Sequence, residues 1–266
     1  MTSEEPVEAR MIVVNGVSKI YFPRRSPPIR ALEDVSLSIG EREFLTLVGP
    51  SGCGKSTLLK LIAGLQSPTT GTIFLNGQVV AAPSREVGIV FQDPVLLPWR
   101  SALDNVLLPV EILGLARAQF VPAARRLLAL VGLGGFERHF PRELSGGMQQ
   151  RVAICRSLIY DPAVLLMDEP FGALDAMTRE ELGFELLRIW TEYRKTILFV
   201  THSIPEAVLL ADRVAVMTPR PGRVAKVITV RLPRPRTTEM AFWPEFREHV
   251  EEIREQVFHR GREARP

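Results

Sequence analysis

The sequence predicts an α/β protein, with a sheet of parallel strands and an inserted helical lobe. Short apolar runs at Phe44–Val48, Val164–Met167 and Thr196–Val200 are typical of strands buried on both faces of a parallel sheet. From Ser101 to Ile159, between the first two runs, the apolar residues change to helical spacing. We therefore expect a helical lobe over about residues 93–161, inserted into an α/β core.

Length and composition are those of a globular chain. The 266 residues suggest one large domain, or one domain with a small lobe. Hydrophobic residues make up 46% and charged residues 24%, which excludes a disordered or fibrous protein. The 33 Lys and Arg nearly balance the 30 Asp and Glu, so we expect no nucleic-acid partner. No apolar run reaches the length of about 18 residues that a membrane-spanning helix needs.

The N-terminal part is expected to contain strands joined by tight turns. Residues 1–10 are acidic and lack an apolar stretch, which predicts a flexible tail rather than a signal peptide. Val13–Phe22 and Val35–Ile39 are predicted to be strands. Asn76-Gly77 is a strong turn pair, so a β-hairpin is expected around it.

The C-terminal part is expected to end in a helix. Leu232–Arg236 is rich in proline and arginine and reads as a linker. Pro244 suits the first turn of a helix, so residues 237–266 are expected to form a helical tail. Its apolar residues recur at helical intervals, which favours packing on its own domain over a dimer or partner contact. They are Phe246, Val250, Ile253 and Val257.

An eight-residue segment between a predicted strand and a predicted helix fits the pattern G-x-x-x-x-G-K-S. Its glycines let backbone N–H groups wrap a phosphate, its lysine adds a positive charge, and its serine can reach Mg²⁺. Cys53 is interpreted as a small filler rather than a nucleophile, because no base lies near it in the sequence. With the next residue, the expected nucleotide contacts are Gly49, Pro50, Ser51, Gly52, Cys53, Gly54, Lys55, Ser56 and Thr57.

The apolar run Val164–Met167 ends in two carboxylates, Asp168 and Glu169. In nucleoside triphosphatases with such a phosphate loop, an acid at this strand end holds Mg²⁺, and Asp168 fits that role. Glu169 is then available to orient or deprotonate the attacking water. The alternative is a solvated acidic turn before Pro170, which the phosphate loop upstream makes less plausible.

Ser145, Gly146 and Gly147 form a second candidate anion site. Ser145 can cap a helix, and the two glycines expose backbone N–H groups at its start. Alone, this pattern indicates only a capped helix. Because it lies in the helical lobe, it need not reach the phosphate loop of its own chain. Two chains related by two-fold symmetry could each supply half of each site.

Together these motifs resemble those of the ATP-binding-cassette (ABC) ATPases, from about Met11 to Val230. Beyond the phosphate loop and the acidic strand end, the S-G-G-x-Q core of that family matches Ser145, Gly146, Gly147 and Gln149. Two positions depart from the family pattern. Met148 stands where many members have Gln, and Gly172 where many have Ser, but neither change removes a charged group.

The resemblance implies roles for further residues. Gln92 would touch Mg²⁺ and couple the nucleotide to a transmembrane partner, and Asp175 would lie at a dimer interface. His202, directly after a predicted strand, would contact the γ-phosphate, and Tyr21 would stack on adenine. The expected catalytic residues are then Glu169, His202 and Gln92, and the expected Mg²⁺ ligands are Ser56, Gln92 and Asp168.

The resemblance also implies a fold and two cofactors, ATP and Mg²⁺. The fold would be a P-loop NTPase core with a mixed sheet, an antiparallel β subdomain and the inserted helical subdomain, over residues 11–236. Two such chains would close on two nucleotides and reopen after hydrolysis.

Four segments narrow the resemblance to the importer subfamily for nitrate, sulfonate, taurine and related small anions. They are Leu96–Ser101, Asp104–Val106, Thr201–Ala207 and Pro219–Arg223. This implies three partners: transmembrane permease subunits, a second copy of the chain and a solute-binding protein. The chain would lie peripherally at the cytoplasmic face of the inner membrane, and its cysteines show no disulfide pattern that contradicts a reducing compartment. Trp99 would lie near the groove for a permease helix; the alternative is a core aromatic residue.

The alternative function is that of a non-transport ABC ATPase acting in nucleic-acid or translation processes. Such proteins usually carry a long coiled-coil insertion or two cassettes in one chain. This sequence has one cassette and no heptad run, which favours the transporter subunit. A kinase-like P-loop enzyme would leave Ser145–Arg151 without an explanation.

Overall fold

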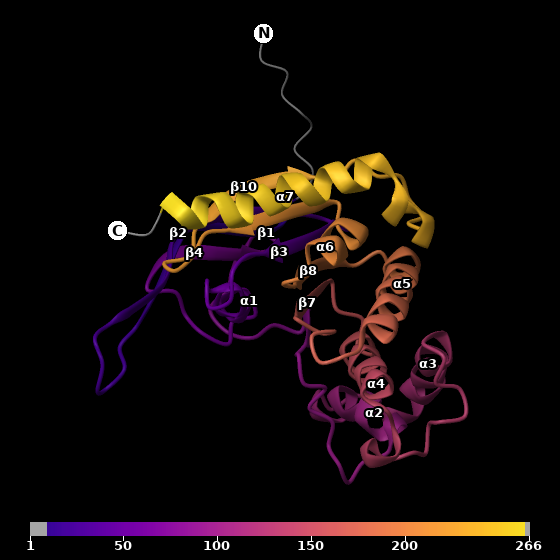
Figure 1. The fold of residues 1–266 in the computed structure, drawn as a ribbon. Coiled ribbons are helices and arrows are strands. Elements are labelled where there is room, and N and C mark those ends of the chain that lie inside the picture. Colours follow the sequence, from indigo (N-terminus) through magenta and orange to yellow (C-terminus); the bar gives the residue numbers. More distant parts are fainter. Residues whose placement is uncertain (1–9, 264–266) are drawn as a thin grey trace. The chain divides into compact units, whose positions relative to one another are not determined.

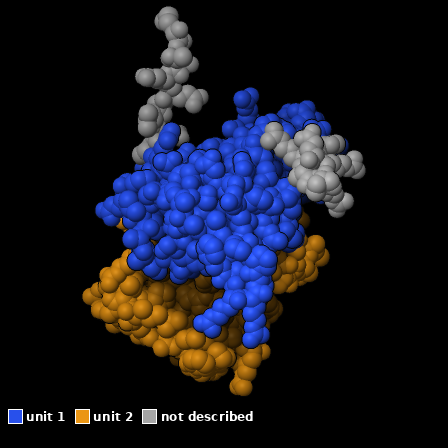
Figure 2. All heavy atoms as spheres, turned by 90° about the vertical axis from the view of Figure 1, so that its left-hand side faces the viewer, with its two compact units in different colours: residues 1–84, 194–266 blue, residues 85–193 orange. Residues whose placement is uncertain are grey.

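The computed structural model describes residues 10–263, which form two compact units. Unit 1 is formed by described residues within segments 1–84 and 194–266, and unit 2 consists of residues 85–193 (Figure 2). Unit 2 is thus wider than the expected lobe of about residues 93–161. The expected flexible tail lies outside the described residues except for Arg10, which begins a strand.

Unit 1 contains a four-stranded antiparallel sheet in the order β2-β1-β4-β5. Its strands are β1 (Arg10–Tyr21), β2 (Ile29–Gly40), β4 (Thr70–Leu75) and β5 (Gln78–Val79). Between β4 and β5, Asn76 and Gly77 have φ angles of 48° and 75°. Positive φ at both central residues is what a two-residue hairpin turn requires. The predicted hairpin is therefore confirmed.

A second group of strands in unit 1 is mixed. β3 (Phe44–Val48) runs parallel to both β8 (Thr196–Val200) and β9 (Arg213–Met217), and β10 (Val224–Thr229) is antiparallel to β9. All five residues of β3 and all five of β8 are buried, which is why these strands read as continuous apolar runs. The helix α1 (Lys55–Ile62) follows β3. The predicted α/β fold with a mixed sheet is confirmed.

Unit 2 combines a parallel strand pair with helices. β6 (Val87–Val90) pairs with β7 (Val164–Asp168). The helices are α2 (Ala102–Ile112), α3 (Arg117–Leu130), the 3-10 helix η1 (Pro141–Glu143), α4 (Gly146–Leu158) and α5 (Ala176–Tyr193). The predicted change to helical spacing is confirmed, since Val106, Leu107 and Val110 share a buried face of α2.

The C-terminal part of unit 1 contains α6 (Ile204–Leu210), the 3-10 helix η2 (Thr238–Phe242) and α7 (Pro244–Glu263). The yellow helix α7 in Figure 1 runs along β10, and it contacts α6, β9 and β10. Phe246, Val250 and Ile253 are buried. The prediction that this helix packs on its own domain is confirmed. Within residues 10–263, no helix combines the length and apolar character needed to cross a bilayer.

No motif includes His139, His249 or His259, so the sequence predicts surface positions for them. His139 and His249 are instead partly enclosed. The side chain of His249 is only 15% exposed, and its Nε2 accepts a hydrogen bond from the Arg231 backbone N–H at 3.1 Å. His139 is half-buried, and its ring centroid lies 4.9 Å from that of Phe136. The side chain of His259, also expected at the surface, lies outside the described residues.

Candidate nucleotide-binding site

The phosphate loop of unit 1 joins the end of β3 to the start of α1. Gly54, the last residue before α1, has a φ of 107°. A Cβ at Gly54 would lie 2.6 Å from the Leu32 side chain and 3.0 Å from the Ala31 carbonyl oxygen. A larger residue would therefore meet both backbone strain and a collision. Cys53 is buried and packs near Gly49, as expected of a filler.

Lys55 folds back over the loop that precedes it. Its side chain is only 5% exposed, and Nζ donates hydrogen bonds to the carbonyl oxygens of Gly49 at 2.9 Å and Pro50 at 3.2 Å. The ammonium group is thus held at the centre of the loop, where α1 begins. A positive charge and the backbone N–H groups of a helix start together favour a bound phosphate.

Tyr21 and Thr57 lie close together in unit 1. The Tyr21 hydroxyl donates to Gln66 Oε1 at 2.7 Å and approaches Thr57 Oγ1 at 3.4 Å. Lys19 Nζ lies 5.3 Å from the ring centroid of Tyr21, over its face. These three contacts hold an aromatic ring beside the first turn of α1, as stacking on a nucleotide base would require.

His202 follows β8, between a buried residue and a helix cap. Thr201 is buried, whereas His202 is exposed. Ser203 caps α6, since its side chain accepts from the Glu206 backbone N–H at 3.4 Å. Ser203 and Glu206 have the sequence spacing of a capping box. In the structure this box is modified, because the Thr201 hydroxyl accepts from the Ser203 N–H and hydrogen-bonds to the Glu206 carboxylate. His202 is thereby presented at the end of the strand.

In unit 2, the two expected carboxylates stand at the end of β7. Asp168 is the last strand residue, and Asp168 and Glu169 are both half-buried. Glu169 has a φ of 47°, and its carbonyl oxygen accepts from the Gly172 N–H at 3.0 Å. A left-handed glutamate is an uncommon conformation that functional turns often contain.

Gln92 lies against this acidic turn. A Cβ at Gly172 would be 3.3 Å from Gln92 Nε2 and 3.3 Å from the Glu169 carbonyl oxygen. The structure thus brings Gln92 and the segment after Glu169 together. It also gives a reason for the glycine at 172, because a side chain there would press on Gln92.

Ser145 caps α4, as the sequence predicted. Its Oγ accepts from the Met148 N–H at 3.2 Å, and Gly146 and Gly147 are the first two helical residues. Gln149 is turned toward the preceding loop, where its amide nitrogen donates to the carbonyl oxygens of Pro141 at 3.0 Å and Leu144 at 3.2 Å. In this structure Gln149 therefore shapes the approach to the helix.

Asp175 caps α5. Its carboxylate accepts from the Thr178 N–H at 3.0 Å and from the Thr178 hydroxyl at 2.7 Å, and these bonds lower the pKa of Asp175.

Trp99 is 71% exposed, so the alternative that it is a core aromatic residue is wrong for this chain.

Three residues that no sequence motif indicated hold these loops. Gln150 donates to the Phe91 carbonyl oxygen, Arg156 donates to two carbonyl oxygens just beyond Gln92, and Arg179 donates to Phe171 and Leu174 on either side of Gly172. All three lie within helices. Gln150 falls inside Ser145–Arg151, but the family pattern assigns it no role, and Arg156 and Arg179 lie outside any local motif. No feature of the sequence alone distinguishes them from ordinary helix residues.

The expected Mg²⁺ ligands have suitable chemistry. The hydroxyl of Ser56, the amide of Gln92 and the carboxylate of Asp168 all offer oxygen atoms, which Mg²⁺ prefers. Within residues 10–258, whose side chains are described, no group of three or more His, Cys, Asp or Glu could hold a metal ion. A Mg²⁺ site with one carboxylate relies on substrate phosphates for further ligands.

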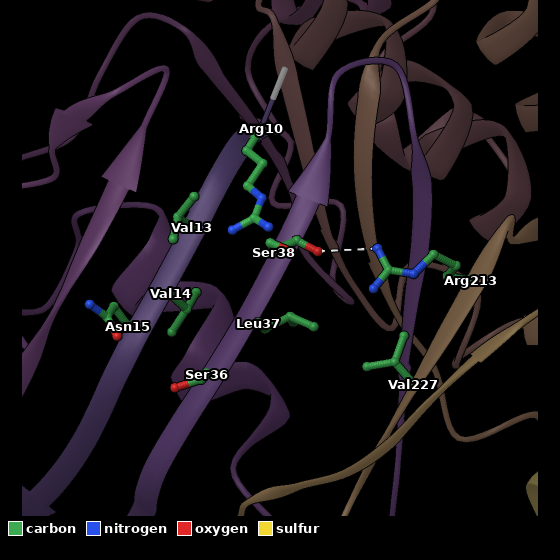
Figure 3. A pocket seen from close by; sticks show the side chains of 9 residues that line it. All are labelled: Arg10, Val13, Val14, Asn15, Ser36, Leu37, Ser38, Arg213 and Val227. Carbon is green, nitrogen blue, oxygen red and sulfur yellow. Dashed lines mark hydrogen bonds between the residues drawn. The ribbon is translucent and has the colours of Figure 1, made fainter. Parts of the chain in front are cut away.

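A cavity of about 470 Å³ in unit 1 is a separate feature (Figure 3). It is lined by residues of β1, β2 and β9 and by Val227 of β10, and Arg213 Nη1 donates to the Ser38 carbonyl oxygen at its edge at 3.3 Å. None of the expected nucleotide contacts lines it.

The chain belongs to the ABC transporter family. The family model described as "ABC transporter" matches residues 32–172. This confirms the family resemblance inferred from the motifs, and with it an ATP-hydrolysing cassette.

Three relatives indicate which kinds of ABC transporter protein the chain is similar to. The chain is 43% identical to an aliphatic sulfonates import ATP-binding protein of Bacillus cereus, over 90% of this chain and 94% of the relative. It is 49% identical to a taurine import ATP-binding protein of Burkholderia thailandensis, over 80% of this chain and 82% of the relative. It is also 48% identical to an ABC transporter ATP-binding protein of Methanocaldococcus jannaschii, over 89% of this chain and 88% of the relative.

Solved structures agree with the fold. A dimeric post-hydrolysis structure of an ATP-binding cassette bound to ADP and Pi has a TM-score of 0.72 and 34% identity, covering 84% of this chain and 100% of that one. A dimeric bacterial ABC transporter cassette has a TM-score of 0.74 and 35% identity, with the same coverage.

Proposed function

We propose that this chain is the ATP-hydrolysing subunit of an importer for small anionic solutes of the nitrate, sulfonate and taurine type. The structural observation that carries the proposal is the closeness of Gln92 to Gly172, where a Cβ would lie 3.3 Å from both Gln92 Nε2 and the Glu169 carbonyl oxygen. The expected coupling residue thus lies beside the turn that begins at the expected base. The relatives named as sulfonate and taurine import proteins support the importer class. They do not support the nucleic-acid or translation alternative.

Unit 1 would bind the nucleotide. Lys55 and the N–H groups at the start of α1 would hold the β- and γ-phosphates, with phosphate oxygens replacing the loop carbonyls as partners of the ammonium group. The ring of Tyr21 would stack on adenine, and His202 would contact the γ-phosphate. Hydrolysis needs these groups mainly for positioning and for balancing charge.

Unit 2 would supply the groups for hydrolysis. Glu169 would take a proton from the water that attacks the γ-phosphorus, while the bond to the ADP oxygen breaks. Asp168, Gln92 and Ser56 would hold Mg²⁺, which neutralises charge on the phosphate oxygens when bound. Hydrolysis by this chain would therefore require both ATP and Mg²⁺.

A second copy would complete each site. Ser145 and the two glycines at the start of α4 would face the nucleotide of the partner copy, and Asp175 would lie at that interface. The dimeric state of the similar cassettes supports this arrangement. Helix N-termini are suited to bind phosphate oxygens.

Transmembrane permease subunits would contact unit 2. Four large apolar side chains of the described part of unit 2 are more than half exposed: Val95 at 61%, Trp99 at 71%, Ile112 at 75% and Met177 at 77%. Apolar side chains that lie together in an exposed patch are typical of a protein contact, and a permease would cover them. The complex would include a solute-binding protein, and the chain would lie peripherally at the cytoplasmic face of the inner membrane.

The proposal is tested by isolating the tagged chain from its native membranes in mild detergent and identifying its partners by mass spectrometry. We expect a polytopic permease in near-equal amount and ATP hydrolysis by the complex that requires Mg²⁺. Cells lacking the chain should lose uptake of a labelled sulfonate or taurine. Only ribosomal or DNA-associated partners, with uptake unchanged, would instead support the alternative function.

A further inference from the structure

Side chains of α4 hold the backbone of the loop that contains Gln92. Gln150 Nε2 donates to the Phe91 carbonyl oxygen at 3.1 Å. Arg156 donates through Nη2 to Pro94 O at 2.6 Å and through Nη1 to Val95 O at 2.8 Å. The bonded carbonyls thus lie on both sides of Gln92.

Further contacts lie at and just past the C-terminal end of α4. Beyond the end of the helix, the Tyr160 hydroxyl donates to the Val87 carbonyl oxygen of β6 at 3.0 Å. A Cβ at Gly88 would lie 2.7 Å from the Ser157 carbonyl oxygen, so β6 and the end of α4 touch through their backbones. Residues 87–95 are therefore held at Val87 by Tyr160, just past α4, and at Phe91, Pro94 and Val95 by side chains of α4 itself.

These contacts are costly to lose because Gln150 is buried and Arg156 is half-buried. Gln150 is 1% exposed. Burial lowers the pKa of Arg156, as expected of a guanidinium that has lost part of its hydration. A buried amide or guanidinium needs acceptors, and backbone carbonyls of the loop provide them.

The loop backbone has an unusual conformation at the point where Arg156 binds. Val95 has a φ of 46°, which is rare for a β-branched residue. Such strain persists only where surrounding contacts impose it. Arg156 binds the carbonyl of Val95 itself and that of its neighbour, so it is placed to hold this conformation.

We propose that Gln150 and Arg156 are positioning residues that lock the Gln92 loop to α4, so that Gln92 and the Ser145 cap move as one body. The inference rests on the proposed function, in which Gln92 serves the Mg²⁺ of one nucleotide and Ser145 the nucleotide of the second copy. A displacement of α4 would then displace Gln92 as well, which links the two nucleotides of a dimer.

The test uses three variants of the full chain. Arg156→Met keeps the length of the side chain and removes its donors, whereas Arg156→Lys keeps the charge and one donor group. Arg126→Met changes an exposed arginine of α3 and serves as the matched control. Gln150→Met supplies a second probe of the same lock, should Arg156→Met fail to fold.

The first measurement is amide hydrogen exchange, followed by mass spectrometry, on peptides that cover residues 87–99. It needs no ATPase activity, so it decides the inference even if the proposed function fails. We expect exchange in this segment to be at least about 10-fold faster in Arg156→Met, intermediate in Arg156→Lys and unchanged in Arg126→Met, because local opening no longer breaks these bonds. Unchanged exchange in a folded Arg156→Met or Gln150→Met would overturn the inference.

The second measurement is the Mg²⁺ concentration that half-saturates ATP hydrolysis, compared with ATP affinity in EDTA. Loss of a group that orients a metal ligand typically costs 10–100-fold in metal affinity, so we expect an increase of roughly that size in Arg156→Met, with ATP affinity in EDTA unchanged. Arg156→Lys should need less Mg²⁺ for half-saturation than Arg156→Met, but more than wild type. A lower turnover with the wild-type Mg²⁺ requirement would indicate a merely structural role and would contradict the inference.

Discussion

The amide nitrogen of Gln92 lies 3.3 Å from where a Cβ would stand on Gly172. This spacing is tighter than ordinary van der Waals contact, so the residue at position 172 controls where Gln92 can lie. The two residues are 80 positions apart in the chain, and only the folded unit brings them together.

The size of the side chain at position 172 should affect ATP hydrolysis through Gln92. Gly172→Val should push Gln92 aside and lower the rate of ATP hydrolysis about tenfold, equivalent to about 1.4 kcal/mol in the barrier. Gly172→Ser adds a hydroxyl that can hydrogen-bond to the Gln92 amide and should stay within about threefold of wild type. Steady-state turnover at saturating Mg-ATP measures both. Equal turnover in the two variants would show that the contact has no effect on hydrolysis.

Glu169 is expected to be the general base. Glu169→Gln should reduce turnover by about 10²- to 10⁴-fold, the usual size for a lost base, while ATP still binds. The variant should elute as a dimer with ATP, because hydrolysis no longer reopens it. Turnover and size-exclusion chromatography are the measurements, and Glu180→Gln, an exposed carboxylate on α5, is the control. Near-normal turnover in Glu169→Gln would remove this residue from the role.

Lys55 should contribute to nucleotide binding through its charge. Hydrogen bonds to charged groups are worth about 1.5–3 kcal/mol, so Lys55→Ala should weaken ATP binding by about 10- to 100-fold. Lys60→Ala, in the last turn of the same helix, should leave ATP affinity unchanged. A fluorescent-nucleotide titration compares the two. If Lys55→Ala bound and hydrolysed ATP like wild type, the phosphate-loop interpretation would be wrong.

A charge network in unit 2 predicts a pH dependence of stability. A hydrogen bond from Arg100 at 2.6 Å, with a further bond from Arg117, lowers the pKa of Glu111 below its ordinary value of 4.5. A lowered pKa in the folded state means that the stabilisation is present above pH 4.5 and is lost as the pH falls through the folded-state value.

Glu111→Gln should therefore reduce the free energy of unfolding at pH 7. The pair is nearly a third exposed, so we expect a loss of only about 0.5–1 kcal/mol. The difference from wild type should shrink as the pH falls below 4.5. Urea unfolding at pH 7, 5 and 3.5 or so measures it, with the exposed Glu248→Gln as control. If the difference in unfolding free energy between wild type and Glu111→Gln grew at low pH, the prediction would be contradicted.

Local patterns in the sequence determined much of this protein. The phosphate loop, the acidic end of β7 and the caps at Ser145 and Ser203 depend on residues within a few positions of one another. Backbone geometry alone relates such residues, so their spacing predicts their structure. The buried strands β3 and β8 were equally predictable, because a strand enclosed on both faces must be apolar throughout.

Contacts between distant positions were decided only by the tertiary structure. Gln150 and Arg156 bind carbonyls that lie 59 to 62 residues away in the chain, and His249 binds the Arg231 backbone from another element. A buried side chain must find a partner, but helical periodicity does not say which one. The exposure of Trp99 is of the same kind, since an aromatic residue fits a core or a contact surface equally well. Sequence spacing therefore identifies the groups that do the chemistry, whereas packing determines which residues hold them in place.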